Sequence, residues 1–145
     1  WRFSQNLIPH VMKAVLGHSP ALQVFGNDFP TSDGTGVRDY IHVEDLARAH
    51  VAALDYLSAG NDSVTCNVGT GHGTSVLEII AATERISGKN VPHDIVGRRD
   101  GDPSQCYADA SLITEKFNWS PQRNLDDIIS SAYAWHSSHP QGHDS

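Results

Sequence analysis

The 145-residue sequence has no long apolar run. A membrane-spanning helix needs roughly 20 consecutive apolar residues, and no stretch approaches that length, so we expect no membrane partner. The first ten residues, WRFSQNLIPH, also lack the extended apolar core of a signal peptide. The sequence has no initiating methionine, which indicates a chain that begins inside a longer protein.

Positive charge and cysteine are also scarce. The chain has 10 Lys and Arg against 17 Asp and Glu, a formal net charge of −7. This balance disfavours nonspecific binding to nucleic acid, so no nucleic-acid partner is expected. Cys66 and Cys106 are the only cysteines. Two cysteines do not make a disulfide framework, so a reducing cytoplasmic location is expected.

Common catalytic and metal-binding patterns are missing as well. Nine histidines are scattered along the chain without a cysteine at zinc-ligand spacing, so no metal site is expected. There is no G-x-S-x-G motif. The Y-x-x-x-K pair, a common base in NAD-dependent oxidoreductases, is also absent. The residues four positions after the tyrosines are Glu44, Gly60, Ser111 and Ser137.

The stretch NVGTGHGTSVLEII (67–80) places three glycines between an apolar run and a helical pattern. A dinucleotide-binding fingerprint has the spacing G-x-G-x-x-G, with an acidic residue about 20 positions further on. Here the spacing is G-x-G-x-G, and Lys89 and Asn90 stand where the acidic residue is expected. We therefore favour a structural turn that needs positive φ, followed by a helix capped by Thr74 or Ser75.

The rest of the sequence is typical of a globular protein, with 39% hydrophobic and 19% charged residues. Strands alternate with helices, which indicates one small α/β domain over 1–145. The strands are too few and short for a complete doubly wound dinucleotide fold, which has six. The pattern predicts helices over 5–17, 44–58, 75–87, 110–117 and 125–138, and strands over 22–26, 37–43, 64–68, 91–97 and 106–109.

Three of these elements have distinctive patterns. VRDYIHV (37–43) alternates between two faces, which is typical of a strand. VTCNV (64–68) is a candidate for a buried strand. The 44–58 segment is strongly amphipathic, a pattern typical of a helix whose apolar face packs on a core. That face consists of Ala47, His50, Val51, Leu54 and Leu57.

Arginines stand at two unusual places. Arg38 shares a strand face with Tyr40, and Arg98 and Arg99 lie in a charged loop. The planar fork of a guanidinium group suits diphosphate oxygens, and two converging forks would hold a nucleotide diphosphate. Two alternatives remain open from the residues alone. Arg38 would otherwise form a salt bridge with Asp39 or Glu44, and the loop would be a solvated charge cluster.

Several long runs together resemble the C-terminal half of the UDP-glucose 4-epimerase family, part of the extended short-chain dehydrogenase/reductases. The resemblance covers nearly the whole chain, whereas the opening WRFSQ departs from it. An asparagine is expected where Gln5 stands, so these residues are interpreted as a junction. The matching runs are NLIPHV (6–11), VFGNDFPTSDGTGVRDYIHVEDLARAH (24–50), NVGTGHGTSVLEII (67–80), RRDGDPSQCYADAS (98–111) and WHSSHPQG (135–142).

The resemblance implies a small C-terminal substrate-binding domain that lacks the Rossmann half. NAD would be bound by that missing N-terminal half, which would also carry the catalytic serine and the tyrosine–lysine pair. No catalytic or cofactor-binding residue is therefore expected in this chain, and the glycine stretch is expected to be a structural turn. The whole enzyme would interconvert UDP-glucose and UDP-galactose. It would be a homodimer whose contacts lie in the missing half.

The resemblance also implies roles for individual residues around the diphosphate of a UDP-hexose. Arg38 and Arg99 would form the diphosphate clamp, as their residue type and positions also suggest. Asn6 would contact the diphosphate through its amide, with Leu7 beside it. Tyr40 would stand at the wall of the sugar-nucleotide site.

The nucleoside and the sugar would meet other residues. Gln23, Val24 and Phe25 would line the uracil, mostly through the backbone and the phenyl ring, and Asp102 would accept a ribose hydroxyl. Cys106 would stand beside the sugar's 2-position, where the resemblance links a small residue to tolerance of UDP-GlcNAc and UDP-GalNAc. The alternative for Cys106 is a small apolar residue at the start of a strand.

Two other functions stay open beside the 4-epimerase. One is a sibling enzyme, such as a sugar-nucleotide dehydratase or a uronate epimerase. The other is a nucleotide-sugar-binding module without catalysis, which fits the absence of an N-terminal half from the sequence. GNDFPTSDGTG (26–36) favours the 4-epimerase.

Overall fold

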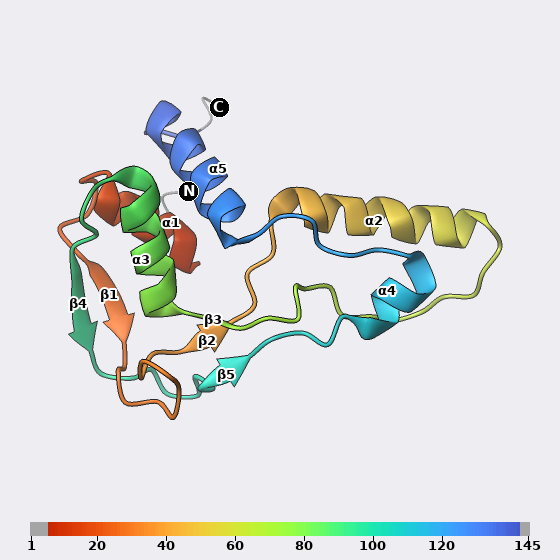
Figure 1. Ribbon diagram of the computed structural model, residues 1–145, viewed down its shortest axis with the longest axis horizontal. Helices are drawn as coiled ribbons and strands as arrows, with labels where there is room; N and C mark the ends of the chain where they lie inside the picture. Colours follow the sequence, from red (N-terminus) through yellow and green to blue (C-terminus); the bar gives the residue numbers. More distant parts are fainter. Residues whose placement is uncertain (1–5, 143–145) are drawn as a thin grey trace.

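The computed structural model describes residues 6–142, so the unusual opening residues 1–5 lie outside the described part. Helices and strands alternate along most of the chain, which confirms the predicted α/β class (Figure 1). The elements are α1 (Leu7–Val15), β1 (Leu22–Phe25), β2 (Val37–Arg38), α2 (Val43–Ser58), β3 (Thr74–Ser75), α3 (Val76–Ser87), β4 (His93–Val96), β5 (Gln105–Cys106), α4 (Ser111–Phe117) and α5 (Leu125–Ser138).

The helix boundaries follow from capping. Ser75 and Glu78 form a reciprocal capping box at the start of α3, and Gly88 ends that helix in the left-handed conformation with φ of 66°. Asn124 and Asp127 form a second capping box at the start of α5. The predicted helices over 75–87 and 125–138 are confirmed. No helix in the described range 6–142 is long and apolar enough to cross a membrane.

The strands form two small sheets. β1 pairs in parallel with β4, with Val24 opposite Ile95. In the second sheet β2 lies between β3, which is antiparallel, and β5, which is parallel. The predicted strand over 37–43 is wrong beyond Arg38. Its ladder ends there because Ala108 donates its amide to the Asp39 carboxylate instead of to the main chain.

The larger part of the molecule, here called the sheet lobe, consists of α1, α3 and α5 packed together beside β1 and β4 (Figure 1). These helices contact one another, and α1 contacts β1. The core between them includes Met12, Val24, Ile79 and Ile129, each at most 1% exposed. The buried side chains of α1, α3, α5 and β1 therefore meet in one core.

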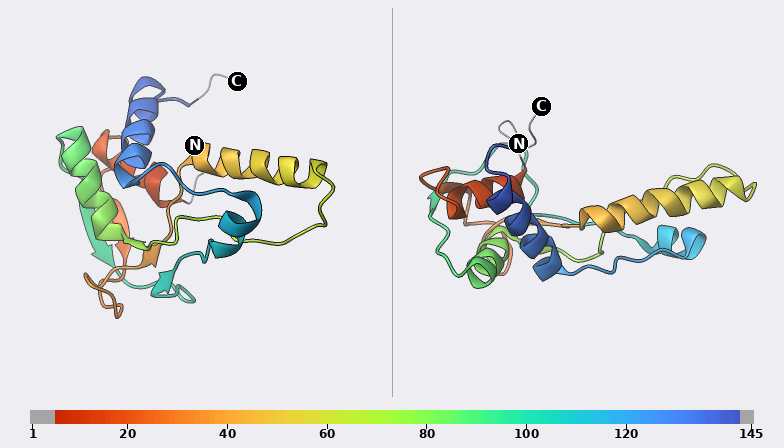
Figure 2. Two further views of the ribbon diagram at one scale, coloured as in Figure 1. Left: turned by 45° about the vertical axis from the view of Figure 1, so that its right-hand side comes forward. Right: turned by 90° about the horizontal axis from the view of Figure 1, so that it is seen from above.

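The smaller part, here called the arm, consists of α2, α4 and the segments 59–68 and 118–124. It extends away from the sheet lobe, most clearly in the view from above (Figure 2). Its buried core is Ala49, Ile113 and Trp119. Asp45, 1% exposed, accepts hydrogen bonds from Arg48 and from main-chain amides of 118–124.

Two predictions for the arm are wrong. The apolar face of α2 points outward, with Leu54 64% and Val51 57% exposed, because α4 and residues 118–124 pack on the opposite side of the helix, around Ala49. Residues 64–68 do not form a buried strand. A strand needs a hydrogen-bonded neighbour, and none of the strand pairings in residues 6–142 includes this segment.

Candidate functional site

A cavity of about 940 Å³ opens beside β1, the first turn of α1 and the 99–102 loop. Its size lies in the range of about 300–1,000 Å³ that is usual for small-molecule sites. Nine of the ten residues that the sequence assigns to a substrate site line this cavity: Asn6, Leu7, Gln23, Val24, Phe25, Arg38, Tyr40, Arg99 and Asp102.

Arg38 lies at the end of β2 with its guanidinium group held at the cavity wall. Its Nη1 donates to the carbonyl oxygen of Pro103 at 2.9 Å and to that of Val37 at 2.8 Å. Its Nη2 lies 3.9 Å from Oδ1 of Asp102. The alternative salt bridges with Asp39 and Glu44 do not form, since Glu44 pairs with Arg123 at 2.7 Å.

Arg99 binds the same carboxylate from within the loop that contains Asp102. Its Nε donates to Oδ2 of Asp102 at 2.9 Å, and its guanidinium carbon lies 4.6 Å from the centroid of the Phe25 ring. Asp102 therefore stands between two guanidinium groups and engages each with a different oxygen. Two cations gathered around one carboxylate form a site suited to an anion with several oxygens, such as a diphosphate.

The 98–102 loop is more than a solvated charge cluster. Arg98 turns away from Asp102 and pairs with Asp28, its Nε 2.6 Å from Oδ1. The guanidinium carbon of Arg98 also lies 4.1 Å from the centroid of the Phe29 ring. The two adjacent arginines thus have different partners, and the cavity is lined by Arg99 and Asp102.

β1 forms another part of the cavity wall. Side chains alternate along a strand, so the exposed Gln23 and the half-buried Phe25 point to one face and Val24 points into the core. What Val24 contributes to the cavity is therefore its main chain. Tyr40 closes the wall near Arg38, and burial raises the pKa of its hydroxyl while the charge of Arg38 opposes that effect. The phenol is protonated at neutral pH.

Cys106 is the one predicted site residue that does not line the cavity. It lies on β5 opposite Arg38, and it is exposed. Cys66 and Cys106 are both free thiols in the structure. Cys106 is thus a strand neighbour of Arg38 without being part of the cavity lining.

The glycine turn (69–73) binds one of the chain's own carboxylates. The amides of Thr70 and Gly71 donate to Asp39 at 3.0 and 3.1 Å, and Ala108 donates to the same group at 3.2 Å. Burial raises the pKa of Asp39, but the hydrogen bonds from Thr70, Ala108 and Gly71 outweigh it and hold the pKa below its usual value. Two amides of the turn are therefore occupied by a protein anion, in agreement with a structural role.

Two glycines of the turn are required for different reasons. Gly71 has φ of +75°, which L residues rarely adopt. Gly69 has no such φ, but a Cβ atom there would overlap the Asp39 carboxylate and the side chain of Ala108. The sequence predicts positive φ for the turn, which is right for Gly71, but it does not reveal the close approach at Gly69.

The sequence interpretation missed two residues near the cavity. Phe29 lies in the polar 27–36 turn, yet it is only 7% exposed and lines the cavity beside the Arg98 side chain. An apolar residue in a polar turn is the signal that would have found it. The sequence places Asp39 in an alternating strand and offers it as a salt-bridge partner of Arg38, but no local pattern indicates its distant partners in the glycine turn.

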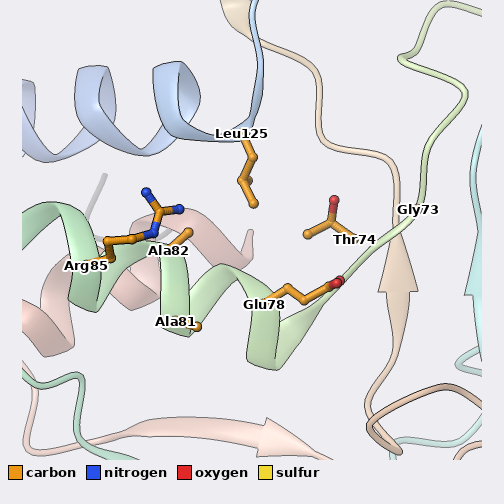
Figure 3. Close-up of a pocket in the computed structure, with 7 residues that line it drawn as sticks. All are labelled: Gly73, Thr74, Glu78, Ala81, Ala82, Arg85 and Leu125. Carbon is orange, nitrogen blue, oxygen red and sulfur yellow. The ribbon is translucent and has the colours of Figure 1, made fainter.

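A second hollow lies between α3 and the start of α5 (Figure 3). Its charged residues already have partners. Arg85 forms a two-point ion pair with Asp126 at 2.7 and 2.8 Å, and Glu78 accepts from the Ser75 amide in the capping box. None of the predicted site residues lines this hollow.

The small α/β domain thus places two guanidinium groups around one carboxylate at the wall of a large cavity, an arrangement whose chemistry suits an anion. Residues 2–132 match the model of the GDP-mannose 4,6 dehydratase family, and the chain belongs to that family. Its sequence is homologous to the C-terminal portion of UDP-glucose 4-epimerases, which confirms the resemblance predicted from the motifs.

Three similar proteins illustrate this relation. The UDP-glucose 4-epimerase of Drosophila melanogaster is 46% identical over 95% of this chain and 40% of that enzyme. The crystal structure of the Stenotrophomonas maltophila enzyme with NAD and formylated UDP-arabinopyranose has a TM-score of 0.92 and 46% identity over 95% of this chain and 41% of its own. The Campylobacter jejuni UDP-Glc/GlcNAc 4-epimerase has a TM-score of 0.83 and 43% identity over 91% of this chain and 40% of its own. The chain thus spans about two fifths of these relatives.

Proposed function

We propose that this chain is the UDP-sugar-binding part of a UDP-glucose 4-epimerase, as one domain over 1–145. The observation that carries the proposal is the convergence of Arg38, Arg99 and Asp102 on a cavity lined by the residues assigned to UDP. The homology supports it, because the related Stenotrophomonas maltophila structure holds a UDP-sugar.

The arginine pair would act on the diphosphate. Each guanidinium group offers a planar set of donors, and two such groups can bind several phosphate oxygens at once. Before the ligand binds, Asp102 pairs with both arginines. Once the diphosphate binds the arginines, the carboxylate is free to accept a hydrogen bond from a ribose hydroxyl. Binding at the diphosphate fixes the nucleotide and leaves the hexose free to turn.

NAD does not fit the residues of this chain. The glycine turn that most resembles a phosphate loop has two of its amides bound to Asp39. We therefore assign the NAD site and the catalytic base to the remainder of a longer, dimeric enzyme, as the relatives' greater length suggests. The free thiols Cys66 and Cys106 suit a reducing cytoplasm.

The test is binding without turnover. Calorimetry with the 145-residue chain should detect UDP binding, whereas UDP-glucose should remain unconverted in the presence of NAD. Adding a separately produced NAD-binding half should restore turnover if the chain is part of an epimerase. UDP binding without restored turnover would instead support the non-catalytic binding module. Absence of UDP binding would contradict both functions.

The substrate range would depend on Cys106. A cysteine leaves the space that a tyrosine ring would fill, and an acetamido group needs about that space. The similarity to the Campylobacter jejuni UDP-Glc/GlcNAc 4-epimerase supports UDP-GlcNAc and UDP-GalNAc as further substrates. In the assembled enzyme, Cys106→Tyr should suppress the N-acetyl reaction and largely spare UDP-glucose. Equal activity of the variant on both pairs would return Cys106 to a structural role.

A further inference from the structure

Asp39 connects three parts of the chain that are distant in sequence. Its carboxylate accepts hydrogen bonds from the main-chain amides of Thr70, Gly71 and Ala108 and from the Thr70 hydroxyl. It directly follows Arg38 at the end of β2, and Ala108 lies two residues after the end of β5. One side chain therefore joins β2, the glycine turn and the chain leaving β5.

This junction fixes the geometry of the arginine site. Arg38 donates to Pro103 and lies near Asp102, and both acceptors belong to the segment that leads into β5. Their position relative to Arg38 depends on the two-residue pairing of β2 with β5, which is short. Asp39 extends that connection by a further hydrogen bond to Ala108, directly beyond the last paired residues.

The contact leaves little room for adjustment. A Cβ atom at Gly69 would overlap the Asp39 carboxylate, so the turn is packed directly against it. An ionised carboxylate only accepts hydrogen bonds, and the amides and the hydroxyl that contact Asp39 all donate. Asparagine has the same shape but carries two donors on one side of its head group, so it would place N–H groups against N–H groups.

We propose that Asp39 is a positioning residue for diphosphate binding, acting through Arg38. The carboxylate never reaches the ligand but holds Arg38 at the correct separation from Asp102 and Pro103. The inference rests on the proposed function, because it assumes that the arginine pair binds the diphosphate of UDP. It adds a residue outside the cavity to the determinants of affinity.

The decisive comparison uses UDP and uridine, measured by NMR titration of the 145-residue chain. Asp39→Asn should weaken UDP binding about tenfold, as expected for losing hydrogen bonds to a charged group. Uridine binding should change less than about twofold, since uridine has no diphosphate for Arg38 to bind. Equal weakening of both ligands would identify a general structural defect and overturn the inference.

Asp45→Asn is the matched control. Like Asp39, Asp45 is a carboxylate that accepts hydrogen bonds from main-chain amides. Its donors are two amides and Arg48, and it lies in the arm and does not line the cavity. The variant should lower stability and leave the UDP affinity of the folded chain unchanged. A tenfold loss of UDP affinity in Asp45→Asn as well would contradict the special role of Asp39.

A double-mutant cycle separates positioning from folding. In an Arg38→Ala background, Asp39→Asn should cause no further loss of UDP affinity, because the group that it positions is gone. Additive losses would overturn the inference. If Asp39→Asn does not fold, Thr70→Val removes the hydroxyl bond alone and should weaken UDP binding about threefold, with uridine unaffected. If the wild-type chain does not bind UDP, the proposed function itself is wrong.

Discussion

The sheet lobe and the arm use the same kinds of residues in opposite ways. The sheet lobe buries eleven apolar residues in one cluster, whereas the core of the arm has three. Large apolar side chains of α2 remain exposed, among them Val43 at 73% and Leu54 at 64%. The arm is connected largely by polar contacts around Asp45, so its stability depends on hydrogen bonds more than on burial.

This contrast indicates that the two parts contribute differently to function. The candidate site lies on the better-packed lobe and the short sheet beside it, where a fixed geometry is needed for binding. The apolar face of α2, in contrast, stays exposed in the part of the chain that the structure describes.

The largest expected effect comes from shortening one apolar side chain in each of the two parts and comparing the loss of stability. Ile79→Ala should lower the free energy of unfolding by about 2–5 kcal/mol, because it leaves a cavity in the core. Leu54→Ala, on the exposed face of α2, should change it by less than about 0.5 kcal/mol. Urea denaturation followed by circular dichroism measures both. A large loss for Leu54→Ala would mean that the arm's outer face is already buried in solution.

The next effect concerns the polar centre of the arm. Asp45→Ala should destabilise the arm by about 2–4 kcal/mol, because it leaves Arg48 and the amides of Gln122 and Arg123 without their acceptor. Hydrogen exchange followed by mass spectrometry should show faster exchange in α2 and α4 and unchanged exchange in α1, α3 and α5. Equal acceleration in all five helices would show that the two parts unfold together.

Ligand affinity should respond to loss of the arginines that line the cavity and not to loss of an arginine in the arm. Arg38→Ala and Arg99→Ala should each weaken UDP binding by about 1.5–3 kcal/mol, the value typical of charge-assisted hydrogen bonds. Arg123→Ala is the matched control, because Arg123 pairs with Glu44 in the arm and does not line the cavity. Calorimetric UDP titration distinguishes them. Unchanged affinity in both cavity variants would assign their arginines to structure alone.

The smallest effect is a loss of stability in acid. Burial raises the pKa values of Asp39 and Asp45, but hydrogen bonds to each carboxylate hold both values below the ordinary 3.8. Their stabilising contribution is therefore fully present above pH 3.8 and is lost as the pH falls through the lower folded-state values. Acid titration by circular dichroism should show this loss, reduced in Asp39→Asn and in Asp45→Asn. A profile unaffected by either substitution would contradict the assigned hydrogen bonds.

Prediction from the sequence succeeded where local rules determine the outcome. The predicted helices over 75–87 and 125–138 agree with α3 and α5 to within one residue, and Ser75, one of the two predicted caps, caps α3. Residue type and family resemblance both single out Arg38 and Arg99, and the structure brings the two side chains to one carboxylate. Their role as a diphosphate clamp stays a prediction.

Prediction failed where the outcome depends on what lies opposite a segment. Residues 64–68 have the composition of a strand but no strand partner among the described residues. The apolar face of α2 does not face a core. Periodicity in the sequence shows that one face of a helix is apolar, but it does not show what covers that face. The role of Asp39 depends on residues about 30 and 70 positions away, which no local pattern encodes.

The glycine turn requires glycine at two positions for two different physical reasons. Gly71 is required by handedness, because its φ of +75° belongs to the mirror-image region, whereas Gly69 is required by volume. A D-amino acid distinguishes the two cases, since D-alanine favours positive φ. Semisynthesis with D-alanine at position 71 should therefore preserve the backbone conformation of the turn. Substitution with a D-amino acid thus distinguishes two glycines that look alike in the sequence.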